Sequence, residues 1–417
     1  MEFDINKDIM PREWVEENSI IKVIGVGGGG CNAVNYMYRQ KIKGCSFIVC
    51  NTDAQALFKS EVPVKIQMGA KGLGAGTDPT EGRNAALESQ DEIAAKVLDN
   101  GTEMLFITAG MGGGTGTGAS PVIAKMAKDR GILTVAVVTI PFKNEGNESQ
   151  SKAVDGIREL EKNVDSLLII NNEKLYEFFG DTLVQEAFPM ADEVLSTAVR
   201  GIIEVITQPG YINVDFKDVS KMMRDSGMAL MGTGIGTGNN RLEDAVKGAF
   251  ESPLLNDFDL KTAKNVLINI TSGNNERGIK MKELETIDEM ITQYTGNANR
   301  FKKGLIWDDD PEIGDQVRIT AIVTGFDMGK LGDITDVNLG NLVIIDNGFE
   351  WKPSRKGGEV PLPDVAPSIK VGFNTSENAR HFHFTSDTKP YLCVDPGQSI
   401  SELEAVPAIR RAHAEKK

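Results

Sequence analysis

The sequence predicts an α/β protein with a mostly parallel sheet, a long central helix and a second, smaller α/β domain. Apolar runs of β type alternate with helical patterns from about residue 20 to residue 172. A strongly periodic segment follows, and a second group of helices and strands comes after it. Because parallel strands need crossover helices, such alternation predicts a sheet covered by helices on both faces.

Six strands are expected in the first part of the chain. Their ranges are 20–26, 46–51, 64–68, 104–109, 132–140 and 166–171. Helical stretches such as Pro121–Ala127 lie between them. Two glycine-rich segments follow strands 20–26 and 104–109. In sheets of this kind ligands bind beyond the carboxyl ends of the strands, which is where both segments fall.

The segment from Met190 to Thr207 predicts the long helix, because its apolar residues recur at helical spacing and form one broad face. Pro209 and Gly210 end it. The pattern then changes to that of a compact domain with a mixed sheet. Its expected elements are helices 217–225, 241–251 and 281–295 and strands 227–236, 264–271, 301–307 and 316–324.

After Gly325 the chain becomes rich in Pro, Ser, Asn, Asp and Gly. Such a segment buries too little apolar surface to offset the entropy of ordering it, so we expect a disordered linker. The predicted organisation is an N-terminal arm (1–19), a first domain (20–189), the central helix (190–208), a second domain (209–326), a linker (327–400) and a tail peptide (401–417).

Composition excludes several classes of function. The formal net charge of −15 argues against nucleic acid as a partner. The four cysteines show no paired framework, and the three histidines lie near the C-terminus, so we expect no metal site built from protein groups alone. No apolar run reaches the roughly 18–20 residues that span a bilayer, and the acidic N-terminus lacks a signal pattern. These features predict a cytoplasmic protein without direct membrane insertion.

The two glycine-rich segments predict a ligand that carries several phosphates. The first is Gly27–Gly30, and the second is Gly110–Gly118. A chain without Cβ atoms lets backbone N–H groups close around an anion, and the following helix adds its positive end. The Walker pattern is absent, which excludes a P-loop enzyme.

A dinucleotide-binding enzyme is the competing interpretation. Gly25–Gly30 matches the G-x-G-x-x-G fingerprint, and Asp53 stands where a ribose-binding acid belongs. That fold, a Rossmann-type NAD-binding oxidoreductase, has no need of the second segment. A nucleotide other than NAD is therefore the favoured ligand.

Gly112–Gly118 reads G-G-G-T-G-T-G and resembles the signature of the tubulin-like GTPases. With Ile24–Gly30, Asn51–Leu57 and Asn213–Val219, the resemblance narrows to the FtsZ family of bacterial cell-division proteins. It covers about residues 20 to 326. It implies a tubulin-like fold, GTP or GDP with Mg²⁺, GTP hydrolysis, and head-to-tail polymerisation into filaments of the midcell division ring.

The resemblance also assigns residues to the nucleotide. Glu145 would contact the ribose, and Phe188 would stack on guanine. Asn172 and Asp192 would read the guanine edge, since a carboxylate accepts from both its ring N–H and its exocyclic amine but mismatches adenine. The complete GTP-binding set is Gly28, Gly29, Gly30, Cys31, Asn32, Gly112, Gly113, Gly114, Thr115, Gly116, Glu145, Asn172, Phe188 and Asp192. The set near the γ-phosphate and Mg²⁺ is Asn51, Asp53, Gly74, Ala75 and Gly76.

Asn213, Asp215 and Asp218 would act on the nucleotide of a neighbouring subunit. A helix of about 18 residues spans roughly 27 Å. If Asp192 touches the base near the start of the central helix, these acids lie beyond its far end. A head-to-tail contact, which generates an open filament, would bring them to the next nucleotide. Without the resemblance, two acids near a turn are usually helix caps or solvated groups.

Two departures from the family pattern affect these assignments. Ser149 stands where the family usually has arginine after Glu-Gly, which keeps open a third interpretation, a non-hydrolysing regulatory paralogue. The approach to Gly72 is also about three residues shorter than usual. At the tail, Pro407, Ile409, Arg410 and Arg411 resemble the family's C-terminal peptide, which implies docking on membrane-tethering and regulatory division proteins.

Overall fold

The computed structural model divides the chain into two compact units, Met1–Val337 and Asn338–Lys417. It describes residues 19–99, 101–173, 184–207, 210–212, 214–251, 260–296, 298, 300–308, 313–326, 345–346 and 382–383. In the second unit, strand β12 (Ile345–Asp346) pairs in parallel with β13 (Phe382–His383). The predicted arm apart from Ser19, the tail peptide, and most of the predicted linker lie outside the described residues.

The first unit begins with the six predicted strands in parallel. They are β1 (Ile21–Val26), β2 (Ser46–Asn51), β3 (Val64–Gln67), β4 (Met104–Gly110), β5 (Leu133–Ile140) and β6 (Ser166–Asn171). Their order in the sheet is β3-β2-β1-β4-β5-β6. All five neighbouring pairs are parallel, so the carboxyl ends of these strands share one edge. The predicted parallel sheet is confirmed.

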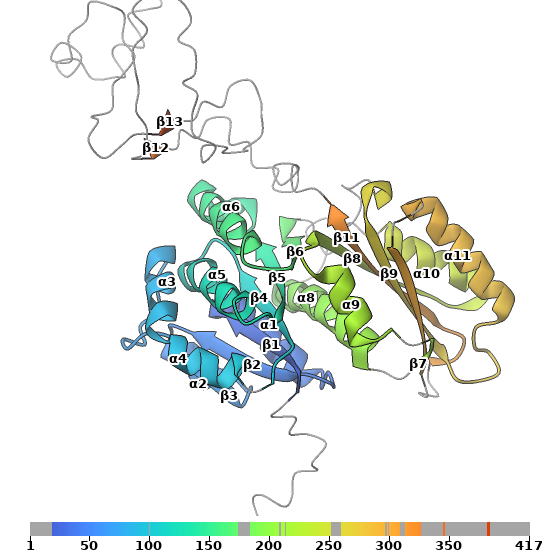
Figure 1. Cartoon of the computed structure of the whole chain (residues 1–417), viewed down its shortest axis with the longest axis horizontal. Coiled ribbons are helices and arrows are strands. Elements are labelled where there is room, and N and C mark those ends of the chain that lie inside the picture. The colour runs from blue at the N-terminus through green and yellow to red at the C-terminus, as the bar shows by residue number, and fades with distance from the viewer. Residues whose placement is uncertain are drawn as a thin grey trace, which may run out of the picture. The chain divides into compact units, whose positions relative to one another are not determined.

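Helices connect these strands (Figure 1). They are α1 (Gly27–Arg39), α2 (Ala54–Lys59), α3 (Pro79–Glu88), α4 (Gln90–Ile93), the π-helical turn η2 (Ala94–Leu98), α5 (Gly114–Lys128), the 3₁₀ turn η3 (Lys143–Glu145) and α6 (Asn147–Glu161). The central helix α8 (Val184–Thr207) begins six residues before the predicted start. The prediction began it at Met190, the first residue of the segment whose apolar residues recur at helical spacing.

The second half forms the predicted mixed sheet. Its elements are β7 (Gly210–Ile212), α9 (Phe216–Met223), β8 (Gly227–Gly236), the 3₁₀ turn η4 (Gly238–Asn240), α10 (Arg241–Phe250), the 3₁₀ turn η5 (Leu260–Thr262), β9 (Asn265–Gly273), α11 (Met281–Thr295), β10 (Arg300–Asp308) and β11 (Val317–Phe326). The strand order continues β6-β8-β11-β9-β10-β7. Only three residue pairs join β6 to β8. The two sheets we expected are therefore one sheet of eleven strands, and the domain boundaries within it stay predictions.

A buried cluster ties the helices to the sheet. Alternate side chains of β1, β4 and β5 pack against α1, α8 and α9. Ala198, Val199, Ile202 and Ile203 of α8 are almost completely buried there. These residues lie on one face of the helix. The apolar periodicity in the sequence therefore marks the face by which α8 packs on the sheet.

Candidate functional site

The two glycine-rich segments meet at the carboxyl edge of the parallel sheet. Gly27–Gly30 form the first turn of α1 rather than a loop before it, and α5 begins at Gly114. A Cβ atom on Gly27 would lie 2.8 Å from the backbone nitrogen of Gly116. Glycine is required here because the two helix starts pack backbone against backbone.

A further glycine-containing segment, Gly72–Asp78, which we call the third segment, lies against the start of α5. A Cβ atom on Gly114 would lie 2.8 Å from the carbonyl oxygens of both Gly76 and Asp78. The end of β2 is held to the same place, since the hydroxyls of Thr52 and Thr115 are hydrogen-bonded at 2.7 Å. Thr52 is not among the site residues predicted from the sequence. Its position directly after Asn51 was the signal that could have found it.

Open space lies beside a glycine of each of these three segments. Cβ atoms on Gly28, Gly76 and Gly113 would meet nothing within 4 Å. Neither α1 nor α5 has a side-chain cap, and neither carries an acidic residue in its first turn. Because the first N–H groups of a helix have no intrahelical acceptor, two uncapped helix starts are suited to bind phosphate oxygens.

Gly112 shapes the turn before α5. Its φ of +99° is in the left-handed region, and its N–H donates to the hydroxyl of Thr117 at 2.8 Å. The hydroxyl of Ser149 donates to its carbonyl oxygen at 3.5 Å. The N–H of Gly112 is therefore occupied, which leaves Gly113 and the first residues of α5 as the donors for an anion.

Two residues assigned to the base carry polar groups that lack compensation. The Oδ1 atom of Asn172, just after β6, is buried and finds no hydrogen-bond partner among the described residues. Burial raises the pKa of Asp192 to about 6, against the opposing effect of the Arg39 guanidinium. A ligand that donates N–H groups would offset both costs. The side chain of Phe188 lies outside the described part of the chain.

Other assigned residues are used within the chain. The thiol of Cys31 points into the protein toward the carbonyl oxygens of Gly25 and Cys50. Burial raises the pKa of that thiol to about 12, so only the backbone of Cys31 is suited to a ligand. Glu145 accepts a hydrogen bond from the N–H of Phe142 at 2.9 Å. Asn32 is exposed.

Asp53 combines a structural role with a free acceptor site. Its Oδ1 caps α2 by accepting from the N–H groups of Gln55 and Ala56. Its own N–H donates to Oδ1 of Asn51 at 3.2 Å. Both capping bonds use one carboxylate oxygen, so Oδ2 is directed elsewhere. One carboxylate beside a bound phosphate is the donor set that Mg²⁺ commonly takes.

The acidic turn before α9 lies toward the opposite edge of the sheet. Asp215 caps α9 by accepting from the N–H of Asp218 at 2.7 Å. Asp218 is paired at 2.9 Å with Lys302, near the start of β10. Since β10 runs in the same direction as β9, β8 and β6, its start lies at the amino edge. Asn213 lies outside the described residues.

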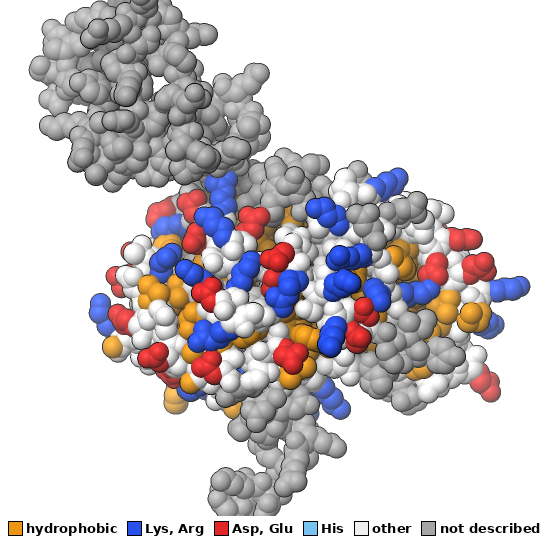
Figure 2. All heavy atoms as spheres, viewed as in Figure 1, with side chains coloured by type: hydrophobic (Ala, Val, Ile, Leu, Met, Phe, Trp, Pro, Cys, Tyr) orange, Lys and Arg blue, Asp and Glu red, His pale blue; other side chains and the backbone are white. Residues whose placement is uncertain are grey.

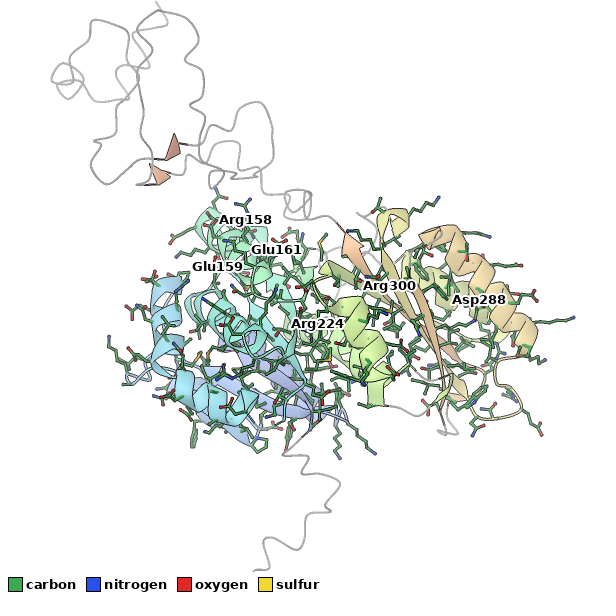
Figure 3. All side chains as sticks on the ribbon, viewed as in Figure 1. Arg158, Glu159, Glu161, Arg224, Asp288 and Arg300 are labelled. Carbon is green, nitrogen blue, oxygen red and sulfur yellow. The ribbon has the colours of Figure 1, made fainter. Side chains whose placement is uncertain are left out.

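The end of α8 lies at the same amino edge. A Cβ atom on Gly44, which precedes β2, would lie 2.6 Å from the Thr207 side chain. Beyond α9, Arg224 donates to the carbonyl oxygen of Gly131, just before β5, at 3.2 Å. Arg224 and Arg300 flank α9 in Figure 3. One strand length, about 20 Å, therefore separates this edge from the glycine-rich segments.

The face of the molecule that is seen in Figure 2 carries side chains of both charges. Figure 2 shows Lys and Arg side chains interspersed with Asp and Glu over the face that carries α5, α6 and α9. Arg224 lies 4.0 Å from Asp165, and Lys128 lies 3.5 Å from Asp225. Much of the positive charge is thus matched within the chain.

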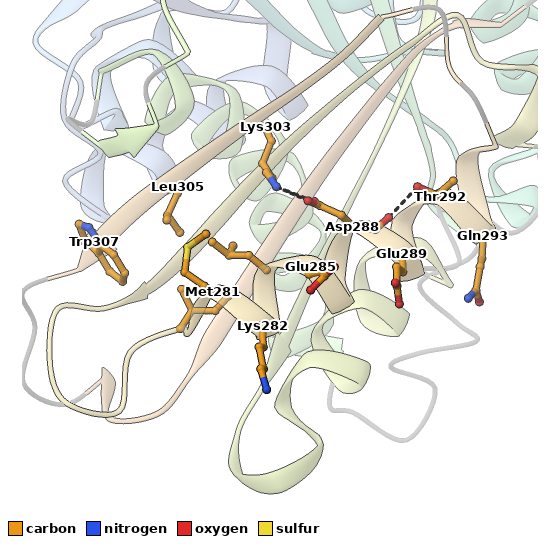
Figure 4. A pocket seen from close by; sticks show the side chains of 12 residues that line it. Met281, Lys282, Glu285, Asp288, Glu289, Thr292, Gln293, Lys303, Leu305 and Trp307 are labelled. Atoms are coloured by element: carbon orange, nitrogen blue, oxygen red, sulfur yellow. Dashed lines mark hydrogen bonds and ion pairs between the residues drawn. The ribbon is translucent and has the colours of Figure 1, made fainter.

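Two cavities lie near different parts of the fold. A small one of about 160 Å³ is lined by Thr52 and the third segment. A larger groove of about 1200 Å³ lies between α11 and β10, with Met281, Leu305 and Trp307 among its lining residues (Figure 4). It contains none of the predicted site residues. The glycine-rich edge remains the candidate site, because its uncapped helix starts supply the chemistry that the groove lacks.

A parallel sheet with glycine-rich helix starts at its carboxyl edge, joined by a long helix to a mixed sheet, defines a tubulin-like nucleotide-binding protein. Residues 20–180 match the model of the Tubulin/FtsZ family, GTPase domain, and residues 227–327 match that of the FtsZ family, C-terminal domain. The chain belongs to the FtsZ family, whose members are cell-division GTPases of the tubulin fold.

Individual relatives support this assignment. The chain is 48% identical over 405 residues to a cell division protein FtsZ from Pseudomonas putida, which covers 96% of this chain and 91% of the relative. It is 46% identical over 414 residues to one from Porphyromonas gingivalis, covering 94% and 85%. A solved FtsZ dimer from M. jannaschii is 39% identical with a TM-score of 0.67, covering 73% of this chain and 88% of that one.

The family excludes the oxidoreductase interpretation, because its GTPase domain spans the segment that matched the dinucleotide fingerprint. Among the described residues, no helix is both long enough and apolar enough to cross a membrane. Nor do those residues bring together three His, Cys, Asp or Glu side chains that could hold a metal ion.

Proposed function

We propose that this chain is a GTPase that polymerises head to tail, with hydrolysis completed by the acidic turn of the adjacent subunit. The observation that carries the proposal is the separation of the two halves of the site. The glycine-rich helix starts lie at the carboxyl edge of the sheet, and Asp218 lies toward the amino edge. Carboxylates at that edge do not reach a nucleotide held by the same subunit.

Stacking subunits in one direction would bring the two halves together. A head-to-tail contact is heterologous and does not close, so it generates a filament. Asp215 and Asp218 would then orient the water that attacks the γ-phosphorus. The bond from that phosphorus to the β–γ bridging oxygen would break, which gives inorganic phosphate and GDP. Positioning and charge stabilisation supply most of the catalysis in phosphoryl transfer.

Mg²⁺ fits the arrangement at the end of β2. The Oδ2 atom of Asp53, together with phosphate oxygens, would hold the ion, and Asn51 would position Asp53 through its backbone N–H. An ion held there would supply positive charge against the phosphate oxygens. Within the chain, Asp53 would orient the ion, while the starts of α1 and α5 would hold the α- and β-phosphates.

The proposal also covers the midcell ring and the partners of the tail peptide. Members of the family are cell-division proteins, so we propose that the filaments form the division ring in the cytoplasm. Pro407, Ile409, Arg410 and Arg411 would dock on membrane-tethering or regulatory division proteins. A non-hydrolysing paralogue is disfavoured by the acidic turn, whose Asp215 and Asp218 are both in place.

Assembly-dependent hydrolysis predicts how turnover varies with protein concentration. Phosphate release per subunit should fall toward zero on dilution below the assembly threshold, because isolated subunits lack the second half of the site. Phosphate release from GTP, measured over a dilution series alongside light scattering, checks this. A rate per subunit that stays constant through the loss of scattering would contradict the proposal.

A side chain placed at the phosphate-binding start of α5 should weaken nucleotide binding strongly without disturbing the fold. In Gly113→Val the new side chain would enter open space, since a Cβ atom there meets nothing within 4 Å. We expect at least about 100-fold weaker binding of GDP and GTP, because the side chain would displace the phosphates from the start of α5. Fluorescent-nucleotide titration measures this.

The matched control is Gly131→Ala, which also meets nothing within 4 Å but lies at the amino edge. Its φ of +73° predicts a loss of stability of about 1–2 kcal/mol and unchanged nucleotide binding. Wild-type affinity in Gly113→Val would mean that the phosphates bind elsewhere.

A further inference from the structure

Helix α6 lies against the second glycine-rich segment along its first turns. A Cβ atom on Gly156 would lie 2.3 Å from the Thr117 side chain and 2.9 Å from that of Met111. One residue within its first turn, Ser149, reaches the carbonyl oxygen of Gly112. Lys152 and Ala153, which follow Ser149 by three and four residues and precede Gly156 by four and three, therefore lie on the helix face that contacts this segment.

Lys152 is the cation that this helix brings to the site. Its ammonium donates to the carbonyl oxygen of Thr77 at 2.8 Å and pairs with Glu148 at 2.6 Å. The Lys152 side chain is 23% exposed, whereas that of Glu148 is 83% exposed. The ammonium is thus held on the protein side, and its acidic partner lies in solvent.

The Thr77 contact places this ammonium where the second and third segments meet. Thr77 lies between Gly76 and Asp78, whose carbonyl oxygens both lie against Gly114 at the start of α5. An ammonium has three donors, of which Thr77 and Glu148 take two. One donor remains for a further acceptor at this junction.

We propose that Lys152 binds the terminal phosphate of a bound guanosine triphosphate. The proposal rests on the proposed function and names the residue that distinguishes tri- from diphosphate. The third segment is assigned to the γ-phosphate. The ammonium of Lys152 is hydrogen-bonded to the backbone of that segment at Thr77. A cation at that point compensates for the fixed charge that is missing at Ser149, one turn earlier on α6.

A purely structural lysine offers a matched comparison. Lys96 makes the same set of contacts: its ammonium donates to the carbonyl oxygen of Lys65 at 3.1 Å and pairs with Glu92, four residues earlier, at 2.7 Å. It contacts none of the glycine-rich segments. Replacing either lysine therefore removes equivalent bonds, and only Lys152 is placed to contact a phosphate.

The test compares affinities for GDP and for a slowly hydrolysed GTP analogue, on the full chain below its assembly threshold. Lys152→Gln should weaken the triphosphate about tenfold, as expected for one charge-assisted hydrogen bond, and GDP less than about twofold. Lys96→Gln should change neither affinity. Lys152→Arg, which keeps the charge, should retain most of the triphosphate affinity.

Equal weakening of both nucleotides in Lys152→Gln, or no weakening, would overturn the role of Lys152. Matching thermal unfolding midpoints for Lys152→Gln and Lys96→Gln would show that folding is not the cause. If the wild-type chain binds neither nucleotide, the proposed function itself fails, so the two failures are distinguishable.

Discussion

Replacing Asp218 with asparagine should reduce GTP hydrolysis about 100-fold while leaving nucleotide binding intact. The expected size is the lower end of what a positioned proton acceptor contributes in enzymes. Binding should survive because Asp218 lies toward the amino edge, paired with Lys302, away from the glycine-rich helix starts. Phosphate release at saturating GTP, together with nucleotide affinity, measures both quantities.

The variant Lys302→Met distinguishes the role of the Asp218 carboxylate from the role of its ion pair with Lys302. This variant breaks the same 2.9 Å contact but keeps Asp218. The Lys302 side chain is 47% exposed, so the pair contributes at most about 1 kcal/mol to stability. We expect hydrolysis within about threefold of wild type. An equal loss in both variants would mean that the ion pair, and not the carboxylate, is what hydrolysis needs.

Mixing two inactive variants tests whether the site is shared between subunits. Asp218→Asn keeps an intact pocket, and Gly113→Val keeps an intact acidic turn. In a mixed filament some pockets meet a complete turn from the neighbour, so activity should return at those contacts. A mixture as inactive as its components, with co-assembly shown by sedimentation, would place both halves in one subunit.

Much of the fold followed from hydrophobic periodicity. The predicted parallel strands agree with the structure to within about two residues at each end, because fully buried strands form continuous apolar runs. Two features did not follow. The pairing of β6 with β8 spans three residues and leaves no pattern in the sequence. The start of α8 could not be predicted because the helix contains Pro189, and proline is rare in the interior of a helix.

The candidate site was predictable in its glycines and less so in its supporting contacts. Glycine runs after buried strands are rare enough to indicate an anion cradle, and the positions open to a ligand, Gly28 and Gly113, lie within them. Thr52 and Lys152 were missed. Their contacts, to Thr115 and Thr77, join segments far apart in the sequence, so no local spacing reveals them.

Arg241 was also missed, since one arginine at a helix start is usually solvated. It is 7% exposed, at the beginning of α10. Its guanidinium pairs with Glu283, the nearest oxygens lying at 2.8 Å. It also donates to the carbonyl oxygens of Arg277, Gly278 and Asp315. One side chain therefore joins α10, the start of α11 and the turns before α11 and β11.

Arg241→Met should destabilise the chain by about 3 kcal/mol. Methionine fills similar volume, but it removes the cation that pairs with Glu283 and the donor of three carbonyl oxygens, so among the described residues Glu283 keeps only the N–H of Lys280. Removing one partner of a buried pair costs about 3–5 kcal/mol. We take the lower end because Glu283 is 24% exposed and regains some hydration. Urea unfolding, followed by circular dichroism, measures the shift.

The control is Arg39→Met, which removes an exposed pair with Glu61 at 2.7 Å. Since both side chains are more than half exposed, its loss should change stability by less than about 1 kcal/mol. Arg241→Lys separates charge from shape. A lysine keeps the charge but has no planar fork to reach the carboxylate and the carbonyls together, so it should recover less than half of the loss. Full recovery by lysine would mean that charge alone holds these elements together.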